Sequence, residues 1–287
     1  MAAWNLLLTS LALTAACSAP ERTAPVAVAI APMPELSGLT VVEHAGLSHL
    51  LAVGDESYEL LVMPLPKDAL GPPTAGASFT IALPLPRRSG GSELEAVAIA
   101  PDGRLAVLSE PGELTFFRLD LAAKTATDPE PLPIVFPPSH PLAAAWDKDP
   151  NERAEGLAFL GERVFIAKQT NPAALIELVR VGDTFEAREH WPLDSEAQLE
   201  DATDLAVLNG SLWVVGGRAL AACELGIPTA GTPLACKTRL ALPDGLEGKK
   251  ARFEGLALPP SGAFILGADV KKTDRPNLAI LPPPRPR

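Results

Sequence analysis

Five copies of one short pattern recur along this chain, and they constrain its fold more than any other feature. Each copy is an apolar run, a tight turn and a second apolar run, as in EGLAFLGERVFIAK from Glu155 to Lys168. The residues that precede the first apolar run are Ser37, Glu95, Glu155, Thr203 and Glu254. Their spacings of 58, 60, 48 and 51 residues resemble the repeat length of four-stranded propeller blades.

Turn-forming pairs lie at nearly the same offset in every copy, which predicts a β-hairpin in each. They are Ala45-Gly46, Asp102-Gly103, Gly161-Glu162, Asn209-Gly210 and Ser261-Gly262. Asp-Gly and Asn-Gly favour two-residue hairpin turns because these residues tolerate a positive φ. In the third copy we expect strands at Gly156–Leu160, Arg163–Lys168 and Ala173–Leu178. The first two are apolar on both faces, so both faces must be covered by neighbouring sheets.

These patterns predict an all-β fold, a β-propeller of five four-stranded blades that forms a single domain over residues 26–287. The last copy has three strands, whereas Val26–Ala31 is an apolar run without a blade of its own. We therefore expect Val26–Ala31 to pair beside Asn277–Leu281 and to close the ring, which removes an exposed edge. Segment Ala122–Arg153 contains a strand near Ile134 and a Pro-rich remainder, either an irregular sixth blade or a cover over one mouth. An irregular β-sandwich is the alternative fold.

The charge balance narrows the range of partners. The net charge is −11, and nucleic acid or an anionic membrane surface would repel such a chain. A small ligand, a cation or another protein is the expected partner, and the chain is expected to be a monomer.

The N-terminal segment predicts export. Residues 1–16 contain an apolar run, Leu6–Leu13, that is too short to span a bilayer but matches the core of a signal peptide. Small residues then precede Cys17, as in a bacterial lipoprotein signal, which predicts lipidation of Cys17 and a tether over residues 17–25. Ser18 favours sorting to the outer membrane. A plain cleaved signal and a misassigned start are the alternatives.

Two further cysteines are candidates for a disulfide. Cys223 is expected in the third strand of the fourth copy and Cys236 in the fourth strand. Adjacent antiparallel strands bring such residues within bonding distance, and an oxidising compartment favours the bond. Two buried thiols are the alternative.

Equivalent positions of the repeat converge in a propeller, so the leading acidic residues are candidate metal ligands. Glu95, Glu155 and Glu254 should meet at one end of the central channel, with Ser37 and Thr203 at the other two positions. Carboxylates at this density either keep protons or share a cation, and Ca²⁺ takes such oxygen ligands. The alternative is that each Glu accepts hydrogen bonds from the backbone of the next blade.

A second set of polar residues follows the second strand of each copy and is the candidate ligand pocket. It consists of Asp55, Glu110, Lys168 and Asp269, with Arg218 nearby. Solvated turn residues are the alternative interpretation. The chain has no GxSxG, HExxH or phosphate-binding glycine motif, so no catalytic site is evident.

The runs EGLAFLGERVFIAKQTNPAALIEL, ELSGLTVVEHAGLSHLLAVGDESYELLVM and RFEGLALPPSGAFILGADVKKTDRPNLAIL resemble repeats of the SdiA-regulated propeller family and of the related phytase-like (esterase-like phytase) propellers. The first resemblance implies an exported propeller that binds calcium or another ligand, and the second implies phosphoester hydrolysis. Two functions follow. One is a lipid-anchored propeller that binds a cation, small ligand or protein at the channel mouth. The alternative is a calcium-assisted phosphoesterase, for which Lys168, Arg218 and Lys271 are the basic residues expected near the mouth.

Overall fold

The computed structural model describes residues 23–67, 71–73, 75–87, 91–149, 153–216, 220–243, 245–246, 249–250, 252–272 and 274–283. The predicted signal segment, Cys17 and Arg218 lie outside these ranges. The described chain is mainly β-structure, with one short α-helix, α1 (Ala143–Lys148), and one 3₁₀ turn, η1 (Ala75–Ala77).

The strands form antiparallel units in chain order. The first unit is β2 (Leu36–His44), β3 (Leu47–Gly54), β4 (Glu59–Pro64) and β5 (Phe79–Ala82). The second is β6 (Leu94–Ile99), β7 (Leu105–Ser109), β8 (Glu113–Asp120) and β9 (Thr125–Val135). The third is β10 (Gly156–Leu160), β11 (Arg163–Lys168), β12 (Ala174–Val181) and β13 (Thr184–Pro192).

The fourth unit is β14 (Asp204–Leu208), β15 (Ser211–Gly216), β16 (Ala221–Gly226) and β17 (Thr238–Ala241). The last sheet contains β20 (Phe253–Ala257), β21 (Phe264–Ala268), β22 (Leu278–Leu281) and β1 (Ala27–Ala29). A two-stranded ribbon, β18 (Gly245–Leu246) with β19 (Lys249–Lys250), precedes it. Two residues of β13 also pair in parallel with β9, which joins the second and third units into one eight-stranded sheet.

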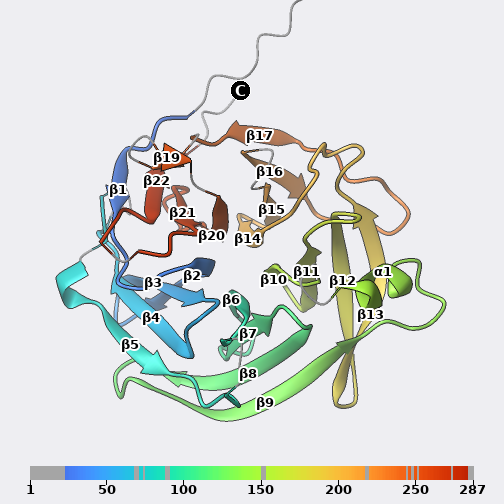
Figure 1. Ribbon diagram of the computed structural model, residues 1–287, viewed down its shortest axis with the longest axis horizontal. Coiled ribbons are helices and arrows are strands. Elements are labelled where there is room, and N and C mark those ends of the chain that lie inside the picture. The colour runs from blue at the N-terminus through green and yellow to red at the C-terminus, as the bar shows by residue number, and fades with distance from the viewer. Residues whose placement is uncertain are drawn as a thin grey trace, which may run out of the picture.

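The units are arranged around a common centre (Figure 1). Their first strands lie innermost, and their fourth strands, with β1 in the last sheet, lie at the rim. Neighbouring first strands contact one another around the centre, from β2 through β6, β10, β14 and β20 back to β2. The apolar side chains form core clusters between adjacent sheets, which is why the inner strands are apolar on both faces.

The hairpins follow the predicted turn chemistry. Strands β10 and β11 have the bounds expected from the sequence, and β12 begins one residue later than expected and runs three residues further. Asn209 and Gly210 have φ values of 51° and 75° between β14 and β15, the conformation that a two-residue turn between twisted strands requires.

The expected partner of the last strand is also present. Strand β1 pairs antiparallel with β22, with Ala27 opposite Ile280 and Ala29 opposite Leu278. The buried side chain of Asn277 strengthens this junction, because its amide accepts from the Ala31 N–H at 2.7 Å and donates to the carbonyls of Ala31 and Met33. The N-terminal strand is thereby fastened to the C-terminal part of the fold.

The Pro-rich segment contains a longer strand than expected. Strand β9 runs through Pro129, Pro131 and Pro133, and α1 follows it. Pro131 and Pro133 lie opposite Thr115 and Glu113 of β8, and their missing N–H groups lie on the side that faces away from β8. A strand at the rim tolerates such a pattern, although the sequence predicts a strand only near Ile134.

Candidate functional site

A polar cavity of about 280 Å³ lies at the end of the inner strands where the repeats begin. Its lining consists of Glu35, Asp55, Glu95, Glu110, Glu155, Gln169, Arg252, Glu254, Asp269 and Lys271. We call this cavity the acidic mouth. Its described lining carries seven carboxyl groups against two basic side chains.

The three leading glutamates meet in the acidic mouth. Glu95 is the second residue of β6, Glu155 directly precedes β10, and Glu254 is the second residue of β20. All three line the cavity, as the repeat register predicted. Glu95 and Glu155 are 8% and 4% exposed, so both carboxyl groups are largely removed from bulk water.

Ser37 and Thr203 occupy the other two leading positions, and both form hydrogen bonds within the fold. Thr203 donates to the carbonyl oxygen of Phe253 at 2.8 Å and so joins the fourth unit to β20. The hydroxyl of Ser37 lies 3.2 Å from the carbonyl oxygen of Glu35 and also hydrogen-bonds to Glu95. Thr203 therefore bonds between neighbouring units at the level of the leading residues.

The second set of polar residues also borders this cavity, but in the third unit the lining residue lies one position later than the sequence predicts. Asp55, Glu110 and Asp269 directly follow β3, β7 and β21, and all three line the mouth. In the third unit the equivalent residue is Gln169, which follows β11.

Lys168 does not line the mouth, contrary to the sequence interpretation. It is the last residue of β11 and is fully buried, and its ammonium donates to the carbonyl oxygen of Thr170. The alternation of a β-strand directs successive side chains to opposite sides, so a one-residue difference in register replaces Lys168 with Gln169.

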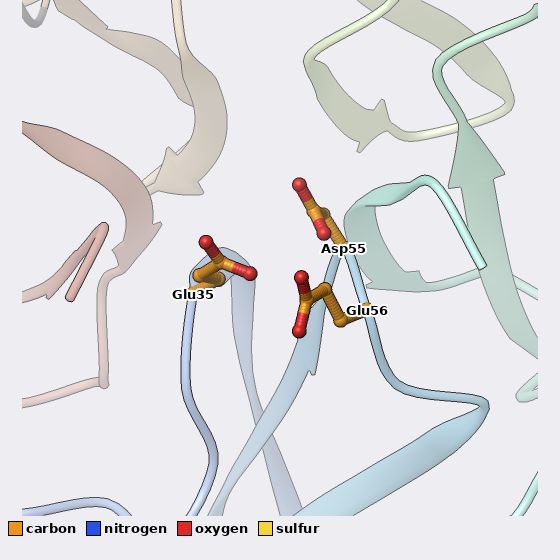
Figure 2. A group of neighbouring side chains, drawn as sticks. All are labelled: Glu35, Asp55 and Glu56. Carbon is orange, nitrogen blue, oxygen red and sulfur yellow. The ribbon is translucent and has the colours of Figure 1, made fainter. Parts of the chain in front are cut away.

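At the edge of the mouth, two lining residues and the exposed Glu56 bring three carboxyl groups close together. Glu35, Asp55 and Glu56 each offer an oxygen, and these atoms lie within 4.8 Å of one another (Figure 2). The ammonium of Lys271 lies 2.8 Å from Glu35 Oε1 and partly compensates this charge. Such a triad is a group of oxygens that can hold a metal ion.

Ion pairing within the mouth is uneven. Arg252 Nη1 lies 3.1 Å from Glu254 Oε1. Within the described part of the chain, the Glu155 carboxylate has no hydrogen bond or salt bridge, although it is almost completely buried. The Glu155 side chain borders the cavity, so either a proton or a bound cation can neutralise this carboxyl group.

The pKa values respond to this crowding. Burial raises the pKa of Glu155 well above its usual range, and the charges of Glu95 and Glu254 raise it further, whereas Arg252 lowers it. Burial also raises the pKa of Glu95, to which Glu110 and Glu254 contribute. Burial raises the pKa values of Glu254 and Glu110 to about 7.

Sequence reasoning missed part of this lining. Glu35 and Arg252 both lie two residues before a leading position, ahead of Ser37 and Glu254. Glu35 has a φ of 48°, and this conformation turns the chain as it enters the first inner strand. A charged residue two positions before the leading residue is the signal that could have identified both.

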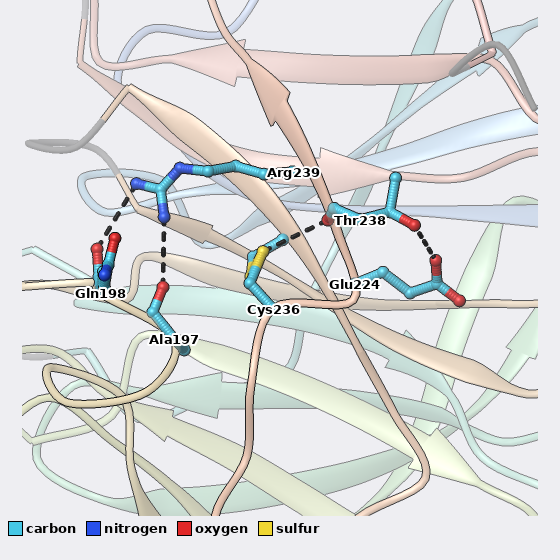
Figure 3. Close-up of a disulfide and its surroundings, with 7 residues drawn as sticks. Ala197, Gln198, Glu224, Cys236, Thr238 and Arg239 are labelled. Atoms are coloured by element: carbon cyan, nitrogen blue, oxygen red, sulfur yellow. Dashed lines mark hydrogen bonds between the residues drawn. A yellow bond between two sulfur atoms is a disulfide. The ribbon is translucent and has the colours of Figure 1, made fainter. Parts of the chain in front are cut away.

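The predicted disulfide is present in the fourth unit, at its third strand, β16. Cys223 in β16 is bonded to Cys236, with Cα atoms 5.4 Å apart (Figure 3). Cys236 lies in the loop before β17 rather than in the fourth strand, and its Sγ also lies 3.3 Å from the Thr238 carbonyl oxygen.

Comparison with known proteins identifies the fold. No family model matches the chain, and no curated protein matches it in sequence. Among solved structures, glutaminyl cyclase from Myxococcus xanthus is 16% identical, with a TM-score of 0.52 over 91% of this chain and 94% of that one. The PQQ-bound aldose sugar dehydrogenase from Streptomyces coelicolor is 15% identical, with a TM-score of 0.49 over 91% and 97%. The first likeness, with the radial sheets, shows a β-propeller fold and nothing about activity.

Among the described residues, no helix has the length and apolar character needed to cross a bilayer.

Proposed function

We propose that this protein is an exported β-propeller that binds a divalent cation, Ca²⁺ by preference, in the acidic mouth. The observation that carries the proposal is Glu155, a buried carboxylate without a direct partner among the described residues, in a cavity that six further carboxylates border. Glu95, Glu155 and Glu254 are the proposed ligands at the axis. Asp55, Glu110 and Asp269 surround them, and Glu35 with Glu56 offers further oxygens.

The donor chemistry supports calcium over the other common cations. Carboxylate oxygens supplied by separate loops suit Ca²⁺, which accepts six to eight oxygens in flexible geometry, whereas Mg²⁺ demands a strict octahedron. No His or Cys is present in the described lining, so the site lacks the nitrogen and sulfur ligands that zinc prefers.

The proposal includes the architecture and location expected from the sequence. We infer five blades in a single domain over residues 26–287, with β1 as the closing strand. We also infer a cleaved signal over residues 1–16, lipidation of Cys17, a short tether and an outer-membrane location. The Cys223–Cys236 disulfide supports an oxidising compartment. The net charge of −11 supports a small ligand or protein partner over nucleic acid.

Phosphoester hydrolysis is not part of this proposal. A phosphate site needs several basic side chains, and in the described lining Arg252 and Lys271 are both placed against carboxylates.

A calcium titration of the purified chain tests the proposal. The protein is freed of ions with EDTA, dialysed and titrated with CaCl₂ by calorimetry, with MgCl₂ and KCl at matched ionic strength as controls. A ligand at one hundred times its dissociation constant stabilises the folded state by about 2.7 kcal/mol, so we expect a rise in melting temperature of several degrees with calcium. The absence of both heat and thermal shift with calcium would contradict cation binding.

A further inference from the structure

Asp204 lies at the centre of the fold, directly below the acidic mouth in the register of the repeat. It is the first residue of β14 and is 1% exposed. The other copies have a small residue at this position, namely Gly38, Ala96, Gly156 and Gly255. A Cβ added at Gly156 would lie 2.7 Å from the nitrogen of Leu205. The inner strands are therefore too close for side chains at these glycines, and the fourth copy alone among the five places a carboxylate at this position.

The carboxylate of Asp204 accepts backbone hydrogen bonds from several inner strands at once. Oδ2 accepts from Leu256 in β20 at 2.6 Å and from Leu39 in β2 at 3.4 Å. Oδ1 accepts from Leu205 in β14 at 2.7 Å, and the amide of Leu157 in β10 also donates to the side chain. One carboxylate thus joins four first strands, which no other side-chain hydrogen bond described in this chain does.

The four donors occupy one position of the repeat. Leu39, Leu157, Leu205 and Leu256 each lie two residues after a leading residue, and for β10 and β20 the leading residues are Glu155 and Glu254. Any shift of these strands relative to Asp204 moves the two glutamates by the same amount, because only one residue separates the glutamate from the bonded amide. The remaining first strand of the described chain, β6, is not among those that donate to Asp204.

This arrangement opposes the repulsion within the mouth. Like charges at the heads of neighbouring strands push those strands apart. Amide donors that share one carboxyl acceptor hold the same strands at a fixed distance from that side chain. The hydrogen bonds to Asp204 therefore resist the separation of the strands, at a position two residues after Glu155 and Glu254.

We propose that Asp204 is a positioning residue for the cation site, which sets the level at which Glu155 and Glu254 converge. This inference rests on the proposed cation binding. Below Asp204 the axis opens into a second hollow of about 170 Å³, lined by the next residues of the same inner strands, such as Thr40, Ala158 and Ala257. Asp204 and its amides therefore also mark the floor of the acidic mouth.

Two substitutions test the proposal against a matched control. Asp204→Asn keeps the shape but replaces one acceptor oxygen with a donor, which faces the amide donors. Asp204→Gly restores the residue found in three other copies. Val214→Ala, in the neighbouring strand β15, removes fully buried apolar volume from the same sheet and serves as the control for general destabilisation.

The readouts are calcium calorimetry, the melting temperature, and a ¹³C NMR titration of glutamate carboxyl groups in the calcium-free chain. For both Asp204 variants we expect at least a tenfold loss of calcium affinity and a shift of the highest glutamate titrations toward ordinary values. Val214→Ala should lower the melting temperature with calcium affinity within about twofold and an unchanged titration. Folded Asp204 variants that keep both the affinity and the titration of the parent chain would overturn the proposal.

A measurement on the unaltered chain covers the case in which the variants do not fold. The amides of Leu157 and Leu256 should then be among the slowest to exchange with solvent, and fast exchange at both would contradict the role of Asp204. The two proposals also remain separable. A parent chain that binds no calcium, but in which Asp204→Asn still shifts the glutamate titrations, would contradict cation binding and support positioning.

Discussion

The guanidinium of Arg252 lies 3.1 Å from the carboxylate of Glu254, which follows two residues later in the chain, on inner strand β20. This pair compensates one glutamate of the three that converge in the acidic mouth. Arg252 also lowers the pKa of Glu155, but it forms no salt bridge with that carboxylate in the described structure. The described lining of the acidic mouth therefore has more carboxyl groups than its two basic residues can pair with. The predictions on cation binding depend on these unpaired carboxyl groups.

Replacing Glu155 should separate binding from stability. We expect Glu155→Gln to lower calcium affinity at least tenfold, and to raise the melting temperature of the calcium-free chain at a pH where Glu155 ionises, because burial and the charges of Glu95 and Glu254 oppose that ionisation. Glu162→Gln changes an exposed residue in the turn after β10 and should leave both quantities unchanged. Calorimetry and thermal melts measure the two effects. Equal calcium affinities for both variants would count against Glu155 as a ligand.

Lys271 should act as a competitor of bound cations. Its ammonium pairs with Glu35 at the triad of Glu35, Asp55 and Glu56. We expect Lys271→Met to strengthen calcium binding by about two- to fivefold, the range for an exposed ion pair. The neighbouring exposed residue provides the control, and Lys272→Met should change affinity less. Weaker binding in Lys271→Met would show that the lysine assists binding instead.

The calcium-free chain should lose stability as pH rises from about 4.5 to about 7. The pKa of Glu254 is about 7 in the folded chain against an ordinary value of 4.5, so the folded state binds protons more readily than the unfolded state within this window. Stability is therefore greatest at the acidic end, and linkage gives a loss on the order of 3 kcal/mol for this group. Glu95 and Glu155 change in the same direction. Denaturant unfolding at several pH values in EDTA checks the slope, and rising stability across this window would be the contrary result.

Removing the disulfide should destabilise the fourth unit. Cys223 and Cys236 are separated by 13 residues, and closing a loop of about this length stabilises a fold by about 3 kcal/mol. We expect the double variant Cys223→Ser with Cys236→Ser to lower the urea midpoint, and dithiothreitol to lower that of the parent chain alone. A midpoint that is the same in the parent chain and the double variant would show that the bond adds no stability.

Releasing β1 should weaken the whole fold. Asn277 makes three buried hydrogen bonds to Ala31 and Met33, so Asn277→Ala should cost about 2–4 kcal/mol. The control is Lys272→Ala, which changes an exposed residue between β21 and β22 and should have little effect. Urea unfolding measures both variants. If Asn277→Ala is as stable as the control, the fastening role of Asn277 is wrong.

The sequence predicts the repeated parts of this protein better than its exceptions. Strands β10 and β11 could be bounded to the residue because Gly161 and Glu162 mark the turn between them. The convergence of Glu95, Glu155 and Glu254 followed from their common place in the repeat. Both inferences depend only on local periodicity, which five copies make visible.

The remainder depends on differences between copies. Lys168 and Gln169 exchange roles because the polar cluster of the third copy begins one residue later than we aligned it. The sequence analysis did not identify Asp204, for a different reason. It looked like an ordinary strand residue beside Thr203, although an acid at a position where three copies have glycine is itself a signal.

The alternating prolines of β9 have a consequence for behaviour at high concentration. Pro131 and Pro133 offer no N–H groups on the side of β9 that faces away from β8. An extended segment from a second molecule would find carbonyl acceptors there without the matching donors, so it could not continue the ladder. The proline-bearing part of β9 is thereby protected from adding a strand of a second molecule, and the adjoining residues Ile134 and Val135 already pair with β13.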